Sequence, residues 1–187
     1  MTDRFKFRAG FTISFYDIAG NDVERQIILD SCFSIDNGGE GICVNETIIQ
    51  EALDIYVAKD EHKTAWDFIN ANYAETDGYY FIDSVDFLDQ CTGLKDKNGK
   101  LIYEGDIVRE SPYNKYFEYA DYVVSWKDGA YTNEKCLGMK NKETGEIKDC
   151  SKGGYCFSKH IHQELADDFE VIGNIHENRD LMEQDNE

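Results

Sequence analysis

The sequence predicts an α+β protein with an N-terminal β-hairpin and a two-helix region, followed by a small C-terminal β-roll or barrel. Three observations lead to this prediction: apolar and polar residues alternate near the N-terminus, two apolar stripes at helical spacing lie between residues 47 and 73, and β-type segments joined by tight turns begin at residue 79. The 187 residues are enough for one large domain or two small ones. We place the boundary where the helical pattern gives way to the β pattern, which divides the chain into an acidic α+β domain at 1–85 and a β domain at 86–187.

The first expected element is the β-hairpin. Phe11, Ile13 and Phe15 occupy every second position, which is the period of a strand with one buried face. A turn-rich segment at 17–22 precedes residues 23–29, which we expect to return as the second strand. Residues 32–35 are expected to add a third strand, and the three glycines within 37–41 indicate a loop.

Two helices are expected to follow. The first should begin near Thr47, because Thr47 and Gln50 have the spacing of a capping box. Its apolar residues form one stripe at helical spacing, namely Ile48, Ile49, Ala52, Leu53, Tyr56 and Val57. The second helix is expected from Glu61 to about Tyr73, and the pair Asp77-Gly78 ends this region.

From residue 79 onward the sequence predicts strands joined by short turns. Asn98-Gly99 is the strongest hairpin signal, and Asp128-Gly129 and Thr144-Gly145 supply two more tight turns. The segment 104–106 is interpreted as a turn that opens a strand, with Tyr103 and Ile107 packing inward. Strands are expected near Ile102 and at 107–110, 119–126, 130–136, 146–150 and 169–175, and a short helix is expected at 159–166.

The chain is strongly acidic, with 38 acidic and 19 basic residues and a formal net charge of -19. Binding to a nucleic-acid backbone depends on lysine and arginine, so direct nucleic-acid binding is disfavoured. Residues 1–90 have a net charge of -12 and residues 91–187 a net charge of -7. Two interpretations remain open: a solvated, self-repelling surface, or a negative face that docks onto a basic groove in place of nucleic acid. The sequence lacks a signal peptide and a membrane-spanning stretch, so we expect a cytoplasmic protein.

The sequence contains no evident catalytic constellation, so we predict no enzymatic activity, no catalytic residue and no cofactor. The six cysteines are expected to be buried free thiols, because the cytoplasm keeps thiols reduced. One metal-like cluster exists, made of Cys150, Cys156, His160 and His162. Five residues separate its cysteines, whereas zinc sites usually have two to four, so no metal ligand is predicted. The loop at 93–100 has the wrong glycine spacing for a phosphate-binding loop.

Three segments in order resemble the signature of the YopX family, a group of small phage and prophage proteins. The main segment is 90–100 followed by 102–108, and the others are 6–9 near the start and 170–178 with Leu181 near the end. The resemblance leaves the insert from about residue 10 to residue 86 unassigned. At His176 and at Arg179-Asp180 the chain departs from the family, which usually has tyrosine and then proline-glutamate there.

The resemblance implies an SH3-like roll or barrel for the C-terminal domain, and it implies no activity. We interpret its glycines as structural residues, needed where tight turns or close packing exclude a side chain. These glycines are Gly93, Gly99, Gly105 and Gly173.

The sequence therefore predicts a non-enzymatic phage or prophage accessory protein that acts by protein–protein binding. An acidic binder suits a basic host or defence protein whose groove normally holds nucleic acid, which would make this chain an inhibitor and a nucleic-acid mimic. The candidate edge is Glu46, Glu51 and Asp54 on the first helix. Two alternatives stay open: a metal-dependent enzyme acting on nucleotides or nucleic acid, and a small-nucleotide sponge that needs an aromatic pocket with basic residues. No membrane partner is expected, and the oligomeric state stays open.

Overall fold

The computed structural model divides the chain into two compact units, one covering Lys6–Asp89 and the other beginning at Gln90. Each unit is described by itself. The residues that the structure describes are 6–17, 19–30, 33–35, 41–83, 85–111, 116–148 and 160–178.

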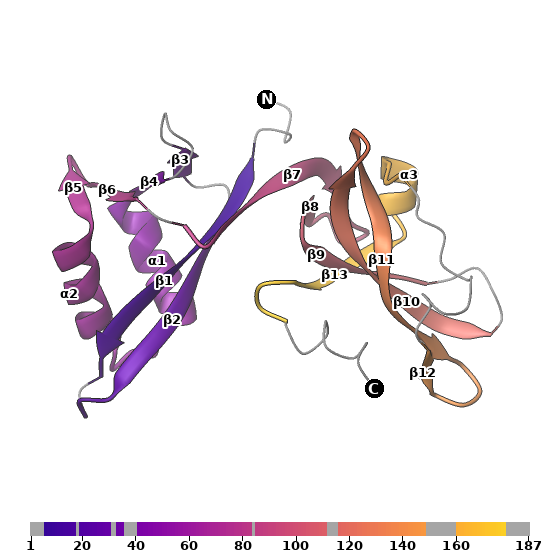
Figure 1. The fold of residues 1–187 in the computed structure, drawn as a ribbon, viewed down its shortest axis with the longest axis horizontal. Coiled ribbons are helices and arrows are strands. Elements are labelled where there is room, and N and C mark those ends of the chain that lie inside the picture. The colour runs from indigo at the N-terminus through magenta and orange to yellow at the C-terminus, as the bar shows by residue number, and fades with distance from the viewer. Residues whose placement is uncertain are drawn as a thin grey trace. The chain divides into compact units, whose positions relative to one another are not determined.

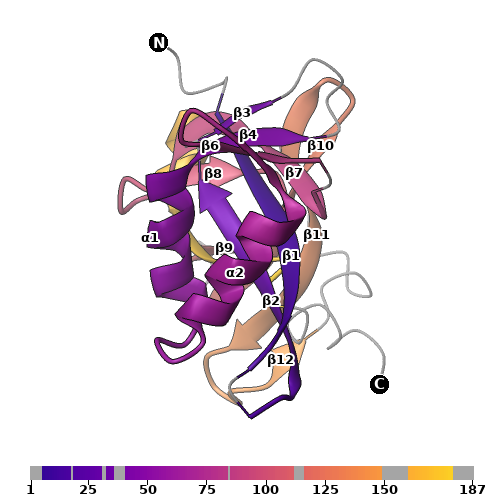
Figure 2. The same ribbon diagram turned by 90° about the vertical axis from the view of Figure 1, so that its left-hand side faces the viewer.

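The first unit is built on an antiparallel hairpin of β1 (Phe7–Tyr16) and β2 (Asp22–Asp30), in which Phe11 lies opposite Ile27. This hairpin confirms the alternation in the sequence, because Phe11, Ile13 and Phe15 are all buried. Helices α1 (Glu46–Tyr56) and α2 (His62–Asn72) lie on the same face of the hairpin (Figures 1 and 2). The opposite face of β1 and β2 carries the alternate, mostly polar residues.

A second, smaller sheet of the first unit has the strand order β3-β4-β6-β5. Two of its strands, β4 (Ile42–Asn45) and β5 (Ala74–Thr76), were not predicted. Both are too short to show an alternating pattern, and they pair through β6 (Tyr79–Ile82) rather than with a sequence neighbour of their own type. The remaining strand, β3 (Phe33–Ile35), lies within the range predicted for a third strand.

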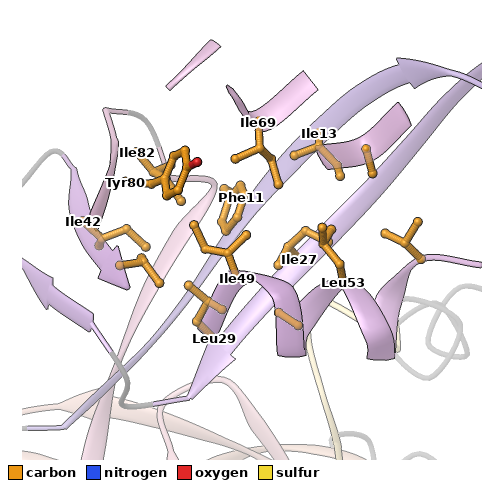
Figure 3. Packing of buried hydrophobic residues seen from close by; sticks show 14 of the residues in the cluster. Phe11, Ile13, Ile27, Leu29, Ile42, Ile49, Leu53, Ile69, Tyr80 and Ile82 are labelled. Carbon is orange, nitrogen blue, oxygen red and sulfur yellow. The ribbon is translucent and has the colours of Figure 1, made fainter. Parts of the chain in front are cut away.

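One hydrophobic core joins these elements (Figure 3). The hairpin contributes Phe11 and Ile27, α1 contributes Ile49 and Leu53, and α2 contributes Ile69, all at most 3% exposed. The small sheet adds Ile42, Tyr80 and Ile82. The predicted stripe of the first helix is therefore confirmed: its central residues are buried, and Ile48 and Tyr56 pack against the same core.

The start of α1 differs from the prediction. The helix begins at Glu46, and its N-cap is Asn45, whose side-chain oxygen accepts a hydrogen bond from the Thr47 amide at 3.0 Å. The capping box at Thr47 and Gln50 is wrong, because Gln50 donates to the Glu46 carboxylate instead. The cause is β4, which stays paired with β6 up to Asn45, so that the helix follows the strand without a linker.

The second unit contains a five-stranded antiparallel sheet in the order β12-β11-β10-β9-β13, curled into a half-barrel (Figure 1). Its strands are β9 (Asp106–Glu110), β10 (Phe117–Lys127), β11 (Ala130–Asn141), β12 (Ile147–Lys148) and β13 (Phe169–Asn174). The predicted turn at Asp128-Gly129 is confirmed, since both residues have positive φ, 51° and 85°. A strongly curved sheet of this kind agrees with the broad α+β class, with strands dominant.

The remaining elements of the second unit are β8 (Leu101–Tyr103) and the short helix α3 (Gln163–Ala166). The predicted helix at 159–166 is confirmed only in its last four residues, and Lys159 lies outside the described residues. Strand β7 (Phe87–Lys95) begins in the first unit beside β1 and continues into the second, where it pairs with β8. Within the described residues, no helix has the length and apolar character needed to cross a bilayer.

A buried ion pair closes the first unit at the start of β7. The Arg8 guanidinium donates to one carboxylate oxygen of Asp89 through Nη2 at 2.6 Å and through Nε at 3.1 Å. The two side chains are only 6% and 10% exposed. Because both charges are buried, the loss of one removes a charge-assisted contact that helps to offset the desolvation cost of the other.

We expect Asp89→Ala to lower the free energy of unfolding by about 3–5 kcal/mol, because it removes a carboxylate partner from the buried Arg8 charge. The measurement is urea denaturation of the single variants Arg8→Ala and Asp89→Ala and of the double variant. The double variant should be less destabilised than the sum of the two singles. Strict additivity would show that the two charges do not depend on each other.

Candidate functional site

The three predicted site residues all lie on α1, but in two rows. Glu46 and Asp54 stand in one row with Gln50 between them, since residues four apart are neighbours on a helix. Glu46 is half-buried and accepts a hydrogen bond from Gln50 at 3.0 Å. Glu51 belongs to the adjacent row and is exposed, as is Asp54, whose side chain is 71% exposed. The structure thus leaves Glu51 and Asp54 available at the surface and ties Glu46 into the first turn of the helix.

Asp54 also borders a cleft of about 280 Å³ between α1 and α2. The cleft contains two groups that can carry positive charge, His62 and Lys63. His62 Nδ1 lies 3.5 Å from the Asp54 carboxylate, and its Nε2 lies 3.0 Å from the Val57 carbonyl. The negative field of Asp54 is therefore partly offset on the cleft side, whereas that of Glu51 is not.

An exposed isoleucine stands beside these carboxylates. Ile55 is 75% exposed and lies one turn after Glu51 in the same row of α1. Sequence reasoning missed it as a site residue. The signal was present, because Ile55 falls outside the apolar stripe that the helix needs for its core. We call these three exposed residues (Glu51, Asp54 and Ile55) the α1 patch.

The charge of the first unit is concentrated on its surface. Its described residues include fifteen carboxylates and five basic side chains. Two of the five are held in internal ion pairs, Arg8 with Asp89 and Arg25 with Glu61, the second at 3.0 Å. The other three are Lys6, Lys59 and Lys63. Arg8 is thus buried with its partner, Arg25 stays partly exposed beside Glu61, and carboxylates outnumber basic side chains among the described residues of the unit.

The uncovered face of the hairpin adds to this negative surface. Across the two strands, Thr12, Ser14 and Tyr16 lie opposite Gln26, Glu24 and Asp22. The exposed Asp86 carboxylate accepts hydrogen bonds from the Thr12 hydroxyl at 2.7 Å and from the Gln26 amide at 3.3 Å. This face is polar and acidic, and it presents no described lysine.

Two segments of the second unit, 90–108 and 170–178, carry the family resemblance. Both contain buried polar side chains that accept hydrogen bonds from backbone amides. Asp96 accepts from the amides of Asn98 and Lys100 at 2.9 Å and from the Val171 amide at 3.0 Å. Asp106 accepts from the Tyr103 amide, and Asn174 accepts from the amides of the turn that follows it. These contacts favour a structural role for the segments.

The glycines of the same segments are of two kinds. Gly93, Gly99 and Gly105 have φ of 79°, 83° and 78°, in the left-handed region that favours glycine. Gly173 is not a turn glycine: it lies inside β13, at a register shift against β9. A side chain there would collide with the Asn178 amide, 2.1 Å from where its Cβ would stand.

A cavity of about 470 Å³ opens in the second unit. Its walls come from β7, from the turn between β10 and β11, and from the segment leading into α3. It is lined by Gln90, Cys91, Thr92, Leu94, Trp126, Gly129, Ala130, Tyr131, Ile161, His162 and Gln163. The aromatic wall required for the nucleotide sponge is present, but the described lining residues include no lysine or arginine to hold a phosphate.

The expectation that all cysteines are free thiols is wrong, because Cys136 is disulfide-bonded. The error came from assuming a reducing compartment and from the wide spacing of the cysteines. Of the metal-like cluster, Cys150 and Cys156 lie outside the described residues. His160 forms an isolated β-bridge with Thr132. His162 is the N-cap residue of α3 and lines the cavity. No group of three or more potential metal ligands occurs among the described side chains.

Comparisons with known proteins give a family and a likeness to solved structures. The model of a family described as YopX protein matches residues 44–183. The chain is similar to the crystal structure of protein EF1440 from Enterococcus faecalis, with 20% identity, 95% of this chain and 97% of that chain covered, and a TM-score of 0.35. The curated proteins give no match. The family match begins before α1, so the segment that seemed unassigned in the sequence belongs largely to the family.

Asp96 gives a prediction that depends on pH. Burial raises the pKa of Asp96, but the hydrogen bonds from Val171, Lys100 and Asn98 outweigh it, so that the pKa lies below its ordinary value of 3.8. The ionised group therefore stabilises the folded state fully above that ordinary value, and this contribution is lost as the pH falls through the lowered folded-state pKa.

We expect Asp96→Asn to lower the free energy of unfolding by about 1.5–3 kcal/mol at neutral pH. In the variant, the side-chain NH2 group of the asparagine would face a backbone N–H donor and could not accept its hydrogen bond. The negative charge of the carboxylate would also be absent. The difference from the wild type, measured by urea denaturation, should shrink below pH 3.8. Glu143→Gln, at an exposed turn, is the control and should show no such pattern. A difference that stays constant with pH would contradict the role assigned to the carboxylate.

Proposed function

The chain belongs to the YopX family, and from that premise we propose that it is a phage-type accessory protein that acts by binding another protein rather than by catalysis. The observation that carries this proposal is the exposed carboxylate surplus of the unit Lys6–Asp89. A surface on which exposed carboxylates outnumber basic side chains attracts a positively charged partner. A basic groove that normally holds nucleic acid is the matching surface, so the partner is a host or defence protein that binds nucleic acid, met in the host cytoplasm.

The α1 patch is the contact point that the structure favours within this surface. The negative charges of Glu51 and Asp54 attract a basic partner over a distance of up to roughly 8 Å at physiological ionic strength. Ile55 supplies apolar area that a partner can remove from water. Long-range charge sets how fast the complex forms, and the buried apolar anchor sets how long it lasts. Glu46 plays no direct part in this version of the site, because its carboxylate stabilises the first turn of α1.

The second unit has a different place in the proposal. We infer that its half-barrel is a roll of the SH3-like kind, with the domain boundary near residue 85, and that it serves as the structural part of the protein. The buried acceptors Asp96, Asp106 and Asn174 support this assignment, since they hold turns together and leave little of the signature for recognition. A crystal structure of the chain would test the roll directly.

Charge reversal tests the steering role. Glu51→Lys with Asp54→Lys should leave folding nearly unchanged, because exposed substitutions usually cost within about 0.5 kcal/mol. The association rate with a partner captured from the host lysate at low salt should fall about tenfold or more. The matched control is Glu143→Lys with Glu146→Lys, which changes the charge by the same amount on an exposed turn of the second unit. Equal loss in both double variants would mean that only net charge matters and would remove α1 as the contact.

Truncation of the anchor tests the contact itself. Ile55→Ser should raise the dissociation rate of the same complex by about tenfold, because it removes about 1–2 kcal/mol of apolar burial. The association rate and its dependence on salt should stay as in the wild type. Surface plasmon resonance with the captured partner separates the two rates. If the dissociation rate does not change, Ile55 remains exposed in the complex and the partner binds elsewhere.

A further inference from the structure

The cavity of the second unit has one fully aromatic wall. Trp126 and Tyr131 face each other across the β10–β11 turn with ring centroids 4.8 Å apart at 72°. Trp126 is nevertheless 54% exposed, so a large part of its ring is not covered by the described protein. An indole face at the mouth of a cavity offers a stacking surface to a flat molecule.

The cavity wall also contains a hydrogen-bonding group with no partner. The Tyr131 hydroxyl is shielded from solvent and makes no hydrogen bond. Leaving such a group unsatisfied destabilises a folded protein, so its presence requires an explanation. Burial raises the pKa of Tyr131 to about 12, with further contributions from Glu104 and Cys91. The hydroxyl therefore stays protonated at neutral pH and can donate a hydrogen bond.

The other polar groups of the wall are already engaged. The Thr92 hydroxyl donates to the Ile102 carbonyl and accepts from the Leu94 amide. The Gln163 amide donates to the Lys95 carbonyl and to Asp167. The Tyr131 hydroxyl, in contrast, has no partner within the described protein and is left to orient a ligand. The described lining residues carry no lysine or arginine, and Glu104 lies near the hydroxyl, so the wall disfavours an anion.

We propose that this cavity binds a small, flat, uncharged heteroaromatic molecule, which stacks on Trp126 and accepts a hydrogen bond from the Tyr131 hydroxyl. The volume of about 470 Å³ lies in the range typical of small-molecule sites. The site is built from residues of the signature segment, Cys91, Thr92 and Leu94, together with the β10–β11 turn. It is separate from the α1 patch and does not depend on the proposed protein partner.

The test uses Trp126 as a fluorescent reporter. The chain has two tryptophans, and Trp66→Phe in the first unit leaves Trp126 as the single indole. The probes are adenosine, cytidine and thymidine, their 5′-monophosphates, and N-acetylphenylalanine amide as a carbocyclic ring. Saturable quenching by at least one nucleoside is expected, with its monophosphate binding about tenfold more weakly because no cation is available for the phosphate.

The variant Tyr131→Phe then separates a ligand role from a structural one. It should weaken nucleoside binding about tenfold while leaving the melting temperature unchanged or raised, because it removes an unsatisfied buried hydroxyl. Tyr119→Phe, on the neighbouring strand β10 and outside the described cavity lining, is the matched control and should bind as the wild type does. The proposal is overturned if no nucleoside quenches Trp126 up to its solubility limit, if only the phenylalanine amide binds, if the monophosphates bind more tightly, or if Tyr131→Phe binds equally well.

Discussion

The carboxylate of Asp96 is the contact on which the second unit depends most. It holds the amides of the Asn98-Gly99 turn with one oxygen and the amide of Val171, on the last strand, with the other. The Lys97 amide donates to the Phe169 carbonyl beside it, and the Lys97 ammonium lies 2.7 Å from the Glu170 carboxylate. One buried side chain thus fixes a local turn and joins it to a strand about seventy residues later. Asp106 and Asn174 accept hydrogen bonds from the amides of their own turns, which gives a structural reason for these short polar residues in the signature segments.

Sequence reasoning succeeded where the determinant was local. The tight turns at Asn98-Gly99 and Asp128-Gly129 need positive φ only at Gly99 in the first and at both residues in the second, and the α1 stripe needs only helical spacing. It failed where the determinant was distant. Strand β4 pairs with β6 nearly forty residues later, and this pairing moved the helix start from Thr47 to Glu46. The cavity draws its walls from three separate parts of the chain, so no window of sequence could have contained it.

The candidate binding surface was also predicted from the sequence only in part. The acidic surplus could be counted in the sequence, and Glu51 and Asp54 lie exposed in the structure. The count could not tell that Arg8 is buried against Asp89 or that the partly exposed Arg25 is paired with Glu61. Both pairings depend on residues distant in the sequence. Ile55 became visible as a surface residue only when the buried face of α1 was known.

The pairing of β1 with β7 has a consequence for the order in which the protein can form during synthesis. The hairpin of β1 and β2 is local and can close as soon as residue 30 has left the ribosome. The hydrogen bond from the Asp86 amide to the Gly10 carbonyl can form only after residue 86 has been made. The ion pair of Arg8 requires Asp89, which is eighty-one residues later in the chain. Until then the outer edge of β1 is an open strand edge, and such edges pair readily with other chains. The first strand to be made is therefore among the last to be completed, and nascent chains stalled before residue 89 are those most exposed to aggregation.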